Sequence, residues 1–180
     1  MMSDPAFLFE GQPVDLPTLL HSREARVQRQ QALLEAYGCP VICVLCNMPG
    51  PVKDHPAARQ VHQAAMDALL EALLQKGFPP ARFQQSLPLL TGPEGYVCIQ
   101  AEAKPLKSLC CRIEQSHPYG RLMDLDVIGL DGIPLSRREF GMPPRACLVC
   151  GGPAADCVSR RLHTLEQVHA GIAAILQPES

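Results

Sequence analysis

Two aspartates, Asp124 and Asp126, are the residues of this 180-residue chain that point most clearly to chemistry. Residues 116–128 read as a strand, and strand side chains two positions apart point to the same face. Both carboxylates then project together, beside Leu122, while the apolar side chains between them line the other face. Two neighbouring carboxylates repel each other unless a cation lies between them. The pair therefore predicts a site for a hard divalent metal, of the kind that phosphoryl and nucleotidyl transfer use.

The competing interpretation of this pair is two solvated carboxylates on an exposed strand face, which is about as common. The residues that precede the pair favour the metal site, because they include His117, Gly120 and Arg121. The apolar character of the strand favours it too. His117, which stands before a proline, is either an acid–base group, a neighbour of the metal or a structural histidine.

Several basic residues are candidates for phosphate contacts. Lys53 follows the stiff loop Pro49-Gly50-Pro51, and Arg137 and Arg138 follow the aspartates. A lysine in such a loop can bind phosphate as a point charge, although exposed loop lysines are common without one. A further set, spaced by three and therefore stacked on one side of a predicted helix, comprises Arg23, Arg26 and Arg29. For this helical set a solvated face is the favoured interpretation.

A second group of residues has the spacing of a zinc site. Cysteines and a histidine follow the pattern Cys147-x2-Cys150-x6-Cys157-x5-His163, which offers ligand types suited to tetrahedral zinc. Zinc binding would help a tail with little core of its own to fold. The alternatives are free cysteines in a chain that has nine, or His169 in place of His163.

The elements that position these residues follow from apolar periodicity and from glycine and proline. The expected helices cover residues 16–37, 57–76 and 105–115, and the expected strands cover residues 41–46, 83–90 and 96–101. The aspartate strand comes next, and Asp131-Gly132 turns the chain into a further short strand that carries Arg137 and Arg138. This order predicts an α+β protein with a ferredoxin-like split β-α-β arrangement: an antiparallel sheet with helices on one face. An N-terminal helix and a small C-terminal Cys/His unit complete it.

Length and composition limit the possible classes. One domain with a small appendage is expected: a loose arm at 1–15, a catalytic α+β domain at 16–142 and a helical Cys/His appendage at 143–180. The net charge of -2 argues against a protein that coats nucleic acid, and no apolar window is long enough to cross a membrane. The odd number of cysteines, several of them in apolar segments, fits a reducing compartment and predicts a cytoplasmic protein.

Five segments, taken in order, resemble the citrate lyase holo-acyl carrier protein synthases, also called apo-citrate lyase phosphoribosyl-dephospho-CoA transferases. The segments cover residues 47–53, 92–95, 116–127, 135–138 and 143–150. The longest contains Ser116-His117-Pro118 and continues through Gly120-Arg121-Leu122 to the two aspartates. The resemblance extends from about Leu16 to beyond His163, which is nearly the whole chain.

The resemblance implies a nucleotidyl transfer. A serine of the citrate lyase acyl carrier protein attacks the α-phosphorus of 2'-(5''-triphosphoribosyl)-3'-dephospho-CoA, and pyrophosphate leaves. By analogy with other nucleotidyltransferases, Asp124 and Asp126 would hold Mg2+, and one of them or a metal-bound water would take the serine proton. Arg121, Lys53 and Arg137 or Arg138 would carry the phosphate charge. The alternative is a non-enzymatic adaptor, folded around zinc, that binds the carrier protein or the lyase complex.

Overall fold

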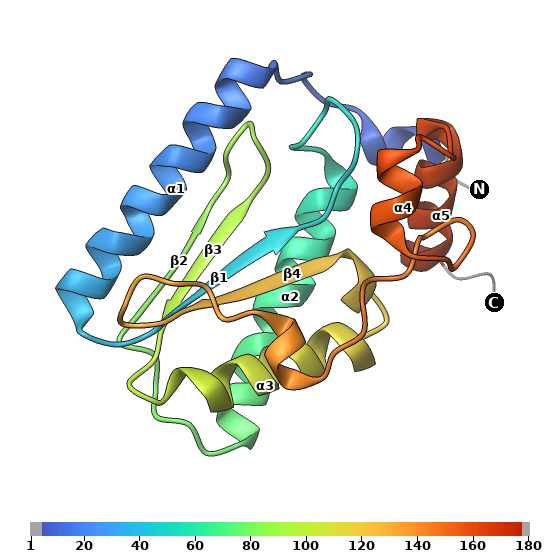
Figure 1. Ribbon diagram of the computed structural model, residues 1–180. Coiled ribbons are helices and arrows are strands. Elements are labelled where there is room, and N and C mark those ends of the chain that lie inside the picture. The colour runs from blue at the N-terminus through green and yellow to red at the C-terminus, as the bar shows by residue number, and fades with distance from the viewer. Residues whose placement is uncertain (1–4, 178–180) are drawn as a thin grey trace.

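The computed structural model describes residues 5–177, and its centre is a four-stranded antiparallel sheet (Figure 1). The strand order is β2-β3-β1-β4. The strands are β1 (Val41–Cys46), β2 (Phe83–Leu87), β3 (Glu94–Cys98) and β4 (Met123–Ile128). The helices are α1 (Leu16–Tyr37), α2 (Pro56–Gln75), α3 (Ala103–Ser116), α4 (Ala154–Ser159) and α5 (Leu165–Leu176). Three 3-10 helices are η1 (Pro5–Phe9), η2 (Gly120–Leu122) and η3 (Arg137–Phe140). The predicted α+β class and the antiparallel sheet are confirmed.

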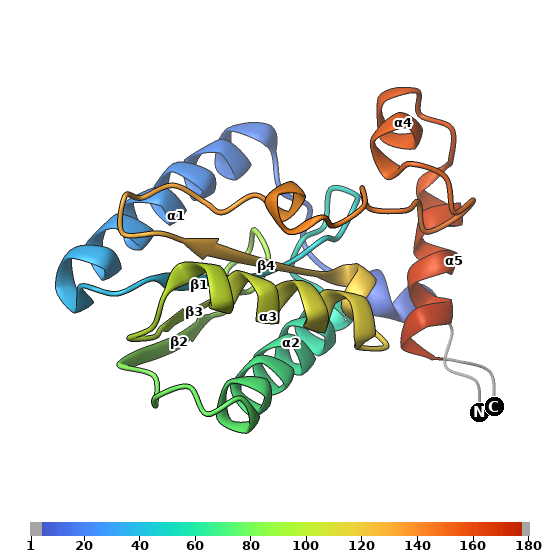
Figure 2. The same cartoon turned by 60° about the horizontal axis from the view of Figure 1, so that its bottom comes forward.

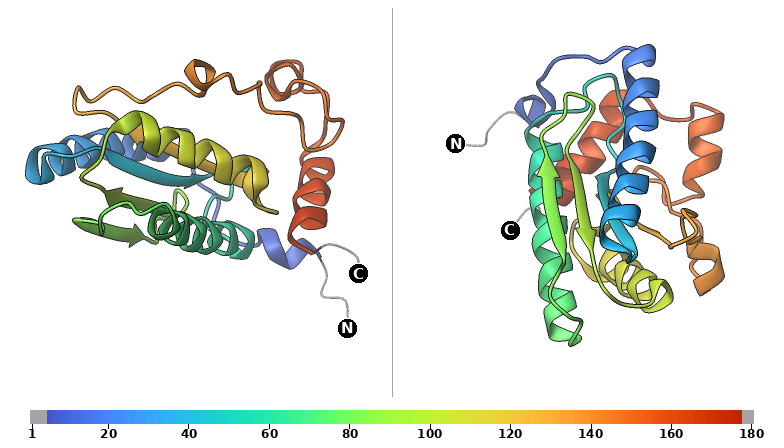
Figure 3. Two further views of the ribbon diagram at one scale, coloured as in Figure 1. Left: turned by 90° about the horizontal axis from the view of Figure 1, so that it is seen from below. Right: turned by 90° about the vertical axis from the view of Figure 1, so that its left-hand side faces the viewer.

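The two faces of the sheet are covered differently. Helices α2 and α3 pack on one face, where their apolar sides meet the inward side chains of β1 and β4 in the main core (Figure 2). Helix α1 lies on the opposite face, above a smaller apolar cluster that includes Leu34, Cys43 and Tyr96. The right-hand view of Figure 3 shows the sheet between α2 and α1. The aspartates of β4 belong to the α1 face, so the helix that covers this face also limits access to them.

Helix α1 owes its bounds to local chemistry. Asp15 caps the helix by accepting a hydrogen bond from the backbone N–H of Thr18 at 2.9 Å. Gly38 ends it in the left-handed conformation, with φ of 58°, which glycine adopts without strain. The helix therefore runs unbroken along the sheet, and its polar residues reach the sheet face at the carboxyl end of β1.

Two predictions about the neighbourhood of the aspartates are wrong. Residues 116–122 are not part of the strand, because α3 continues to Ser116 and residues 120–122 form η2. Gly120 packs so close to the carbonyl of Glu114 that any side chain there would clash, and this contact turns the chain before β4. Leu122 is consequently buried in the main core and does not share the face of the aspartates.

The strand predicted after Asp131-Gly132 is also absent. Ile128 and Pro134 form a single bridge, flanked by hydrogen bonds from the Gly129 N–H to the Ile133 carbonyl and from the Leu135 N–H to the Val127 carbonyl. The pairing goes no further, because side chains of α3 occupy the backbone groups of Leu125. Arg137 and Arg138 instead lie in η3, which begins where Ser136 accepts a hydrogen bond from the Arg138 N–H at 3.3 Å. The segment that contains η3 runs back across the α1 side of β4 (Figure 2).

The N-terminal residues that the structure describes pack against the C-terminal helix. Leu8 of η1 is buried in the main core, and the Phe9 ring stacks on His169 of α5 with centroids 3.8 Å apart. Ile172 and Leu176 of α5 are buried in that same core. No helix within residues 5–177 is long and apolar enough to cross a membrane.

The free edge of β4 is closed by two charged side chains from α3. The Lys107 ammonium donates a hydrogen bond to the Leu125 carbonyl at 2.9 Å, and the Glu114 carboxylate accepts one from the Leu125 N–H at 2.8 Å. Both side chains are almost fully buried. Because an edge strand presents unpaired backbone groups, this pair does for β4 what another strand would do.

Replacing Lys107 with methionine should therefore destabilise the protein. Lys107→Met leaves the Leu125 carbonyl buried without a partner, and we expect the free energy of unfolding to fall by about 2 to 3 kcal/mol in urea titrations. Lys104→Met on the same helix is the matched control, because Lys104 is exposed and its loss should change little. Equal losses in the two variants would contradict this role of Lys107.

Candidate active site

A cleft of ≈ 230 Å³ lies on the α1 face of the sheet, at the carboxyl end of β1. Its walls come from α1, the loop after β1, the turn before β3 and the start of β4. The residues that supply polar or charged groups are Ser22, Arg23, Arg26, Asn47, Lys53, Thr91, Glu94 and Asp124. Four separate segments thus bring polar groups to one hollow over a sheet.

The two aspartates share the cleft side of β4. Asp124 pairs with Leu45 and Asp126 pairs with Cys43, and Cys43 belongs to the apolar cluster beneath α1. Met123, Leu125 and Val127 point the other way into the main core, as the alternation predicts. Each carboxylate keeps 40% of its side-chain surface exposed, so both can still be reached by a ligand.

Protein cations already compensate part of the aspartate charge. Arg145 contacts the Asp124 carboxylate at 2.8 Å, and Lys107 contacts the Asp126 carboxylate at 3.4 Å. Burial raises the pKa of Asp124, and the charge of Asp126 raises it further. The charges of Arg145, Lys107 and Arg137 act in the opposite direction and lower the pKa of Asp124.

Glu114 positions Arg145 and Arg137 beside β4. Its buried carboxylate contacts Arg145 at 3.3 Å and Arg137 at 3.2 Å, in addition to the Leu125 N–H. Arg145 therefore bridges Glu114 and Asp124. Neither Arg145 nor Lys107 was among the candidate residues in the sequence. Lys107 carried a signal, because it interrupts an apolar helical stripe, whereas Arg145 lies in a proline-rich segment without periodicity.

Lys53 lies where the sequence predicts, at the edge of the cleft. Its ammonium donates a hydrogen bond to the Met48 carbonyl at 2.7 Å, which fixes the loop after β1. Burial lowers the pKa of Lys53, and the nearby charge of Arg23 lowers it further. Two cations close enough to perturb each other across a cleft are suited to a ligand with several negative charges.

The arginines of α1 are not a solvated face, contrary to the favoured interpretation. Arg26 contacts Glu94 at 2.8 Å and Arg29 contacts it at 3.3 Å, and Glu94 is only 1% exposed. Tyr96 donates a further hydrogen bond to Glu94 at 2.5 Å. These contacts tie α1 to β3 and leave Arg23, the exposed member of the set, as the α1 arginine without an ion pair among residues 5–177.

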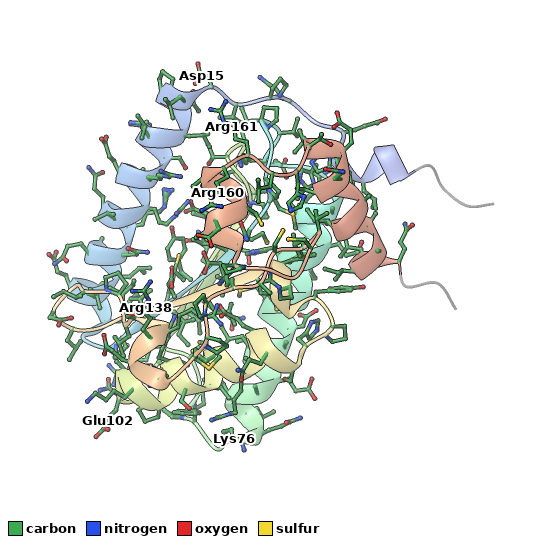
Figure 4. The ribbon with its side chains drawn as sticks, turned by 45° about the vertical axis from the view of Figure 1, so that its right-hand side comes forward. Asp15, Lys76, Glu102, Arg138, Arg160 and Arg161 are labelled. Atoms are coloured by element: carbon green, nitrogen blue, oxygen red, sulfur yellow. The ribbon has the colours of Figure 1, made fainter. Side chains whose placement is uncertain are left out.

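Other predicted residues lie outside this cleft. His117 accepts a hydrogen bond from the Tyr119 N–H at 3.0 Å and lines a separate hollow of ≈ 260 Å³ with Arg121, Arg137 and Arg145. Burial lowers the pKa of His117. Arg138 is exposed on η3 and lines none of these hollows (Figure 4). The structure thus brings Asp124 and Lys53 together with Arg23 and Arg26 and leaves Arg121, Arg137 and Arg138 outside the cleft.

The cysteine and histidine ligands predicted for zinc do gather. One ligand atom from each of Cys147, Cys150, Cys157 and His163 lies within 4.8 Å of the others. The His163 Nε2 atom is buried and has no hydrogen-bond partner within residues 5–177. A buried histidine nitrogen without a partner, on a residue that lies beside three thiols, fits a tetrahedral metal ion.

The turn between the first two cysteines prepares them for a metal. Backbone N–H groups of Cys150 and Val149 lower the pKa of the Cys147 thiol to about 6. Gly151 follows in the left-handed region, with φ of 73°, and its N–H donates to the Cys147 carbonyl. Metals bind the thiolate form, so a lowered pKa favours a ligand at neutral pH.

The C-terminal unit also supports the loop over the cleft. Gly50, in that loop, has a φ of 100°, and a Cβ placed there would lie 3.2 Å from Leu165. His169 lies on the same side, with its Nε2 atom 3.5 Å from that position, and not in the Cys/His cluster. The shape of the cleft therefore depends partly on α5.

Paired carboxylates beside several cations, in a cleft over an antiparallel sheet, are typical of enzymes that transfer phosphoryl or nucleotidyl groups. Residues 14–178 match the family described as "Apo-citrate lyase phosphoribosyl-dephospho-CoA transferase". Curated relatives with this name come from Citrobacter koseri and from Escherichia coli O1:K1, each 37% identical over 91% of this chain and 88% of the relative. A relative from Escherichia coli O139:H28 is 36% identical over the same shares. The chain belongs to the apo-citrate lyase phosphoribosyl-dephospho-CoA transferase family.

The Cys/His cluster should bind one metal ion per chain. Titration of metal-free protein with Co2+ should produce the visible absorption of a tetrahedral site with thiolate ligands, and Cys157→Ser should weaken it strongly. Cys46→Ser is the matched control, because Cys46 lies outside the cluster. A spectrum that survives Cys157→Ser would rule out the cluster as the site.

Proposed function

We propose that this chain transfers the phosphoribosyl-dephospho-CoA group from 2'-(5''-triphosphoribosyl)-3'-dephospho-CoA to a serine of the citrate lyase acyl carrier protein. The serine oxygen forms a bond to the α-phosphorus, the bond from that phosphorus to the bridging oxygen breaks, and pyrophosphate leaves. Membership of the family is the observation that carries this proposal. The cleft, with Asp124 facing Arg23 and Lys53, supports it because a triphosphate needs such a setting.

We further propose the finer architecture that goes with this function. A β-α-β-β-α-β chain order and the sheet order β2-β3-β1-β4 support a ferredoxin-like split β-α-β arrangement. We also propose the division into an arm at 1–15, a catalytic domain at 16–142 and an appendage at 143–180. We propose a cytoplasmic location as well, because the nine cysteines, all within residues 5–177, form no disulfide.

Asp124 and Asp126 would hold Mg2+, and the residues present fit that ion. Their carboxylates share one face and remain partly exposed, and Mg2+ in such sites commonly takes one or two carboxylates together with substrate phosphates and water. When bound, the ion would neutralise part of the negative charge of the triphosphate. One of the two carboxylates would accept the serine proton.

The cations around the cleft would divide the phosphate charge. Lys53 and Arg23 line the cleft and are placed to bind the triphosphate, where negative charge builds up on the departing pyrophosphate. Arg145 would hold Asp124 in place. Contacts of Arg137 and Arg138 with phosphate, and an acid–base role of His117, remain predictions. The structural metal of the Cys/His cluster would be zinc, because three thiolates and one imidazole are its usual ligands.

Loss of either aspartate should abolish Mg2+-dependent transfer. Asp124→Asn and Asp126→Asn should each lower the rate by about 100-fold or more, since they remove charge that holds the metal. The measurement is the mass gain of apo carrier protein incubated with the triphosphoribosyl precursor and Mg2+. Asp131→Asn is the control, because Asp131 lies in an exposed turn. Full transfer by both cleft variants would remove the aspartates from the mechanism. Carrier binding by the wild type without any mass gain would favour an adaptor.

Arg23 lines the cleft, although the sequence alone favoured a solvated position for it. Its replacement therefore tests the cleft as the triphosphate site. Arg23→Ala should raise KM for the triphosphoribosyl precursor about tenfold, because one charge-assisted contact to phosphate is lost. Arg112→Ala, an exposed arginine of α3, serves as the control. An unchanged KM in the Arg23 variant would mean that the triphosphate binds elsewhere.

A further inference from the structure

A pocket of ≈ 370 Å³ separates the Cys/His cluster from the loop after β1, and it is distinct from the cleft of the aspartates. Its apolar wall consists of Pro49, Leu148, Ala154, Val158, Leu165 and Val168. Two arginines, Arg121 and Arg161, also line it. A hollow with an apolar wall and a few charged groups is the usual form of a small-molecule site.

The two arginines of the pocket have no carboxylate partner in the described part of the chain. Neither Arg121 nor Arg161 has an ion pair within residues 5–177, although other arginines of this region do. An anionic ligand would supply the missing counter-charge.

The metal cluster does not balance this charge by itself. Three thiolates around a divalent ion leave one net negative charge, which a single arginine can neutralise. Arg121 and Cys147 line the same pocket, so Arg121 can serve that purpose. Arg161, an exposed residue that follows α4, then remains available to a ligand.

The pocket adjoins the cleft. Asn47 lines both hollows, and its backbone N–H donates to the Leu122 carbonyl at 2.9 Å, next to Arg121. A ligand that lies in both hollows would pass this residue. Such a ligand must be long, with one anionic end for the aspartate cleft and a second part that combines apolar surface with negative charge.

We propose that this pocket binds the dephospho-CoA half of the substrate, with Arg161 on its diphosphate and the apolar wall against its uncharged part. The assignment rests on the proposed function, because it is the triphosphoribosyl precursor that joins a triphosphate to a dephospho-CoA unit. The C-terminal Cys/His unit would then take part in substrate recognition. A metal ion bound to its cluster would hold α4 and the loop before it beside the pocket.

The test is direct binding of two fragments to the metal-loaded full chain, measured by calorimetry without carrier protein. Dephospho-CoA probes the pocket and inorganic triphosphate with Mg2+ probes the cleft. Arg161→Ala should weaken dephospho-CoA about tenfold and leave triphosphate unchanged, while Lys53→Ala should do the reverse. The matched control is Arg160→Ala, which removes the same charge from the adjacent residue, outside the pocket (Figure 4).

Val158→Glu provides a second variant that does not threaten the fold, because Val158 is 77% exposed. The new carboxylate would repel the diphosphate, so dephospho-CoA should again bind at least about tenfold more weakly. Metal content, measured in every variant, shows whether the cluster is intact. Dephospho-CoA binding that is unchanged in both Arg161→Ala and Val158→Glu, or absent from the wild type, would overturn the proposal.

The same experiment separates this pocket from the reaction. A wild type that binds dephospho-CoA through Arg161 and yet adds no mass to the carrier would refute the proposed function while supporting the pocket. A wild type that modifies the carrier while dephospho-CoA binds independently of Arg161 would do the opposite.

Discussion

One buried carboxylate, that of Glu114, organises the side of the molecule where the candidate chemistry lies. It accepts a hydrogen bond from the Leu125 N–H at the free edge of β4 and contacts both Arg137 and Arg145. A buried carboxylate is costly unless such partners satisfy it, so helix, strand edge and C-terminal segment are held to one another. Burial still raises the pKa of Glu114, which shows how far it has been removed from water.

The position of the aspartates follows from this contact. Arg145 reaches Asp124 because Glu114 holds its guanidinium, and Lys107 reaches Asp126 from the same helix that carries Glu114. Helix α3 thus supplies Lys107, the counter-charge of Asp126. Through Glu114 it also anchors Arg145, the counter-charge of Asp124. On the opposite side of the cleft, Glu94 does the same for Arg26 and Arg29 of α1. Each wall of the cleft is therefore built around a carboxylate that the substrate does not need to touch.

How much of this the sequence predicts depends on how local the cause is. The three expected helices, the strand at 41–46 and the shared face of Asp124 and Asp126 follow from short-range periodicity, and they are confirmed. The strands expected at 83–90 and 96–101 exist with other bounds, at 83–87 and 94–98. The Cys/His cluster follows from spacing within a short segment and also gathers. Arg145 lies 21 residues from the aspartate it contacts, in a segment without periodicity, so no local pattern predicts that contact. The strand expected after Asp131-Gly132 fails for a related reason, because Lys107 and Glu114 of α3 occupy the backbone groups of Leu125 that would extend the pairing.

The contact between α5 and Gly50 links the cleft to the oxidation state of the thiols in the Cys/His cluster. The loop over the cleft rests on Leu165, and the segment before α5 depends on the thiols of the cluster. Cys150 and Cys157 have sulfur atoms only 3.5 Å apart, so an oxidant that takes two electrons from them would join them in a disulfide. Such a bond would deprive the metal of two ligands at once and loosen the loop without altering either aspartate.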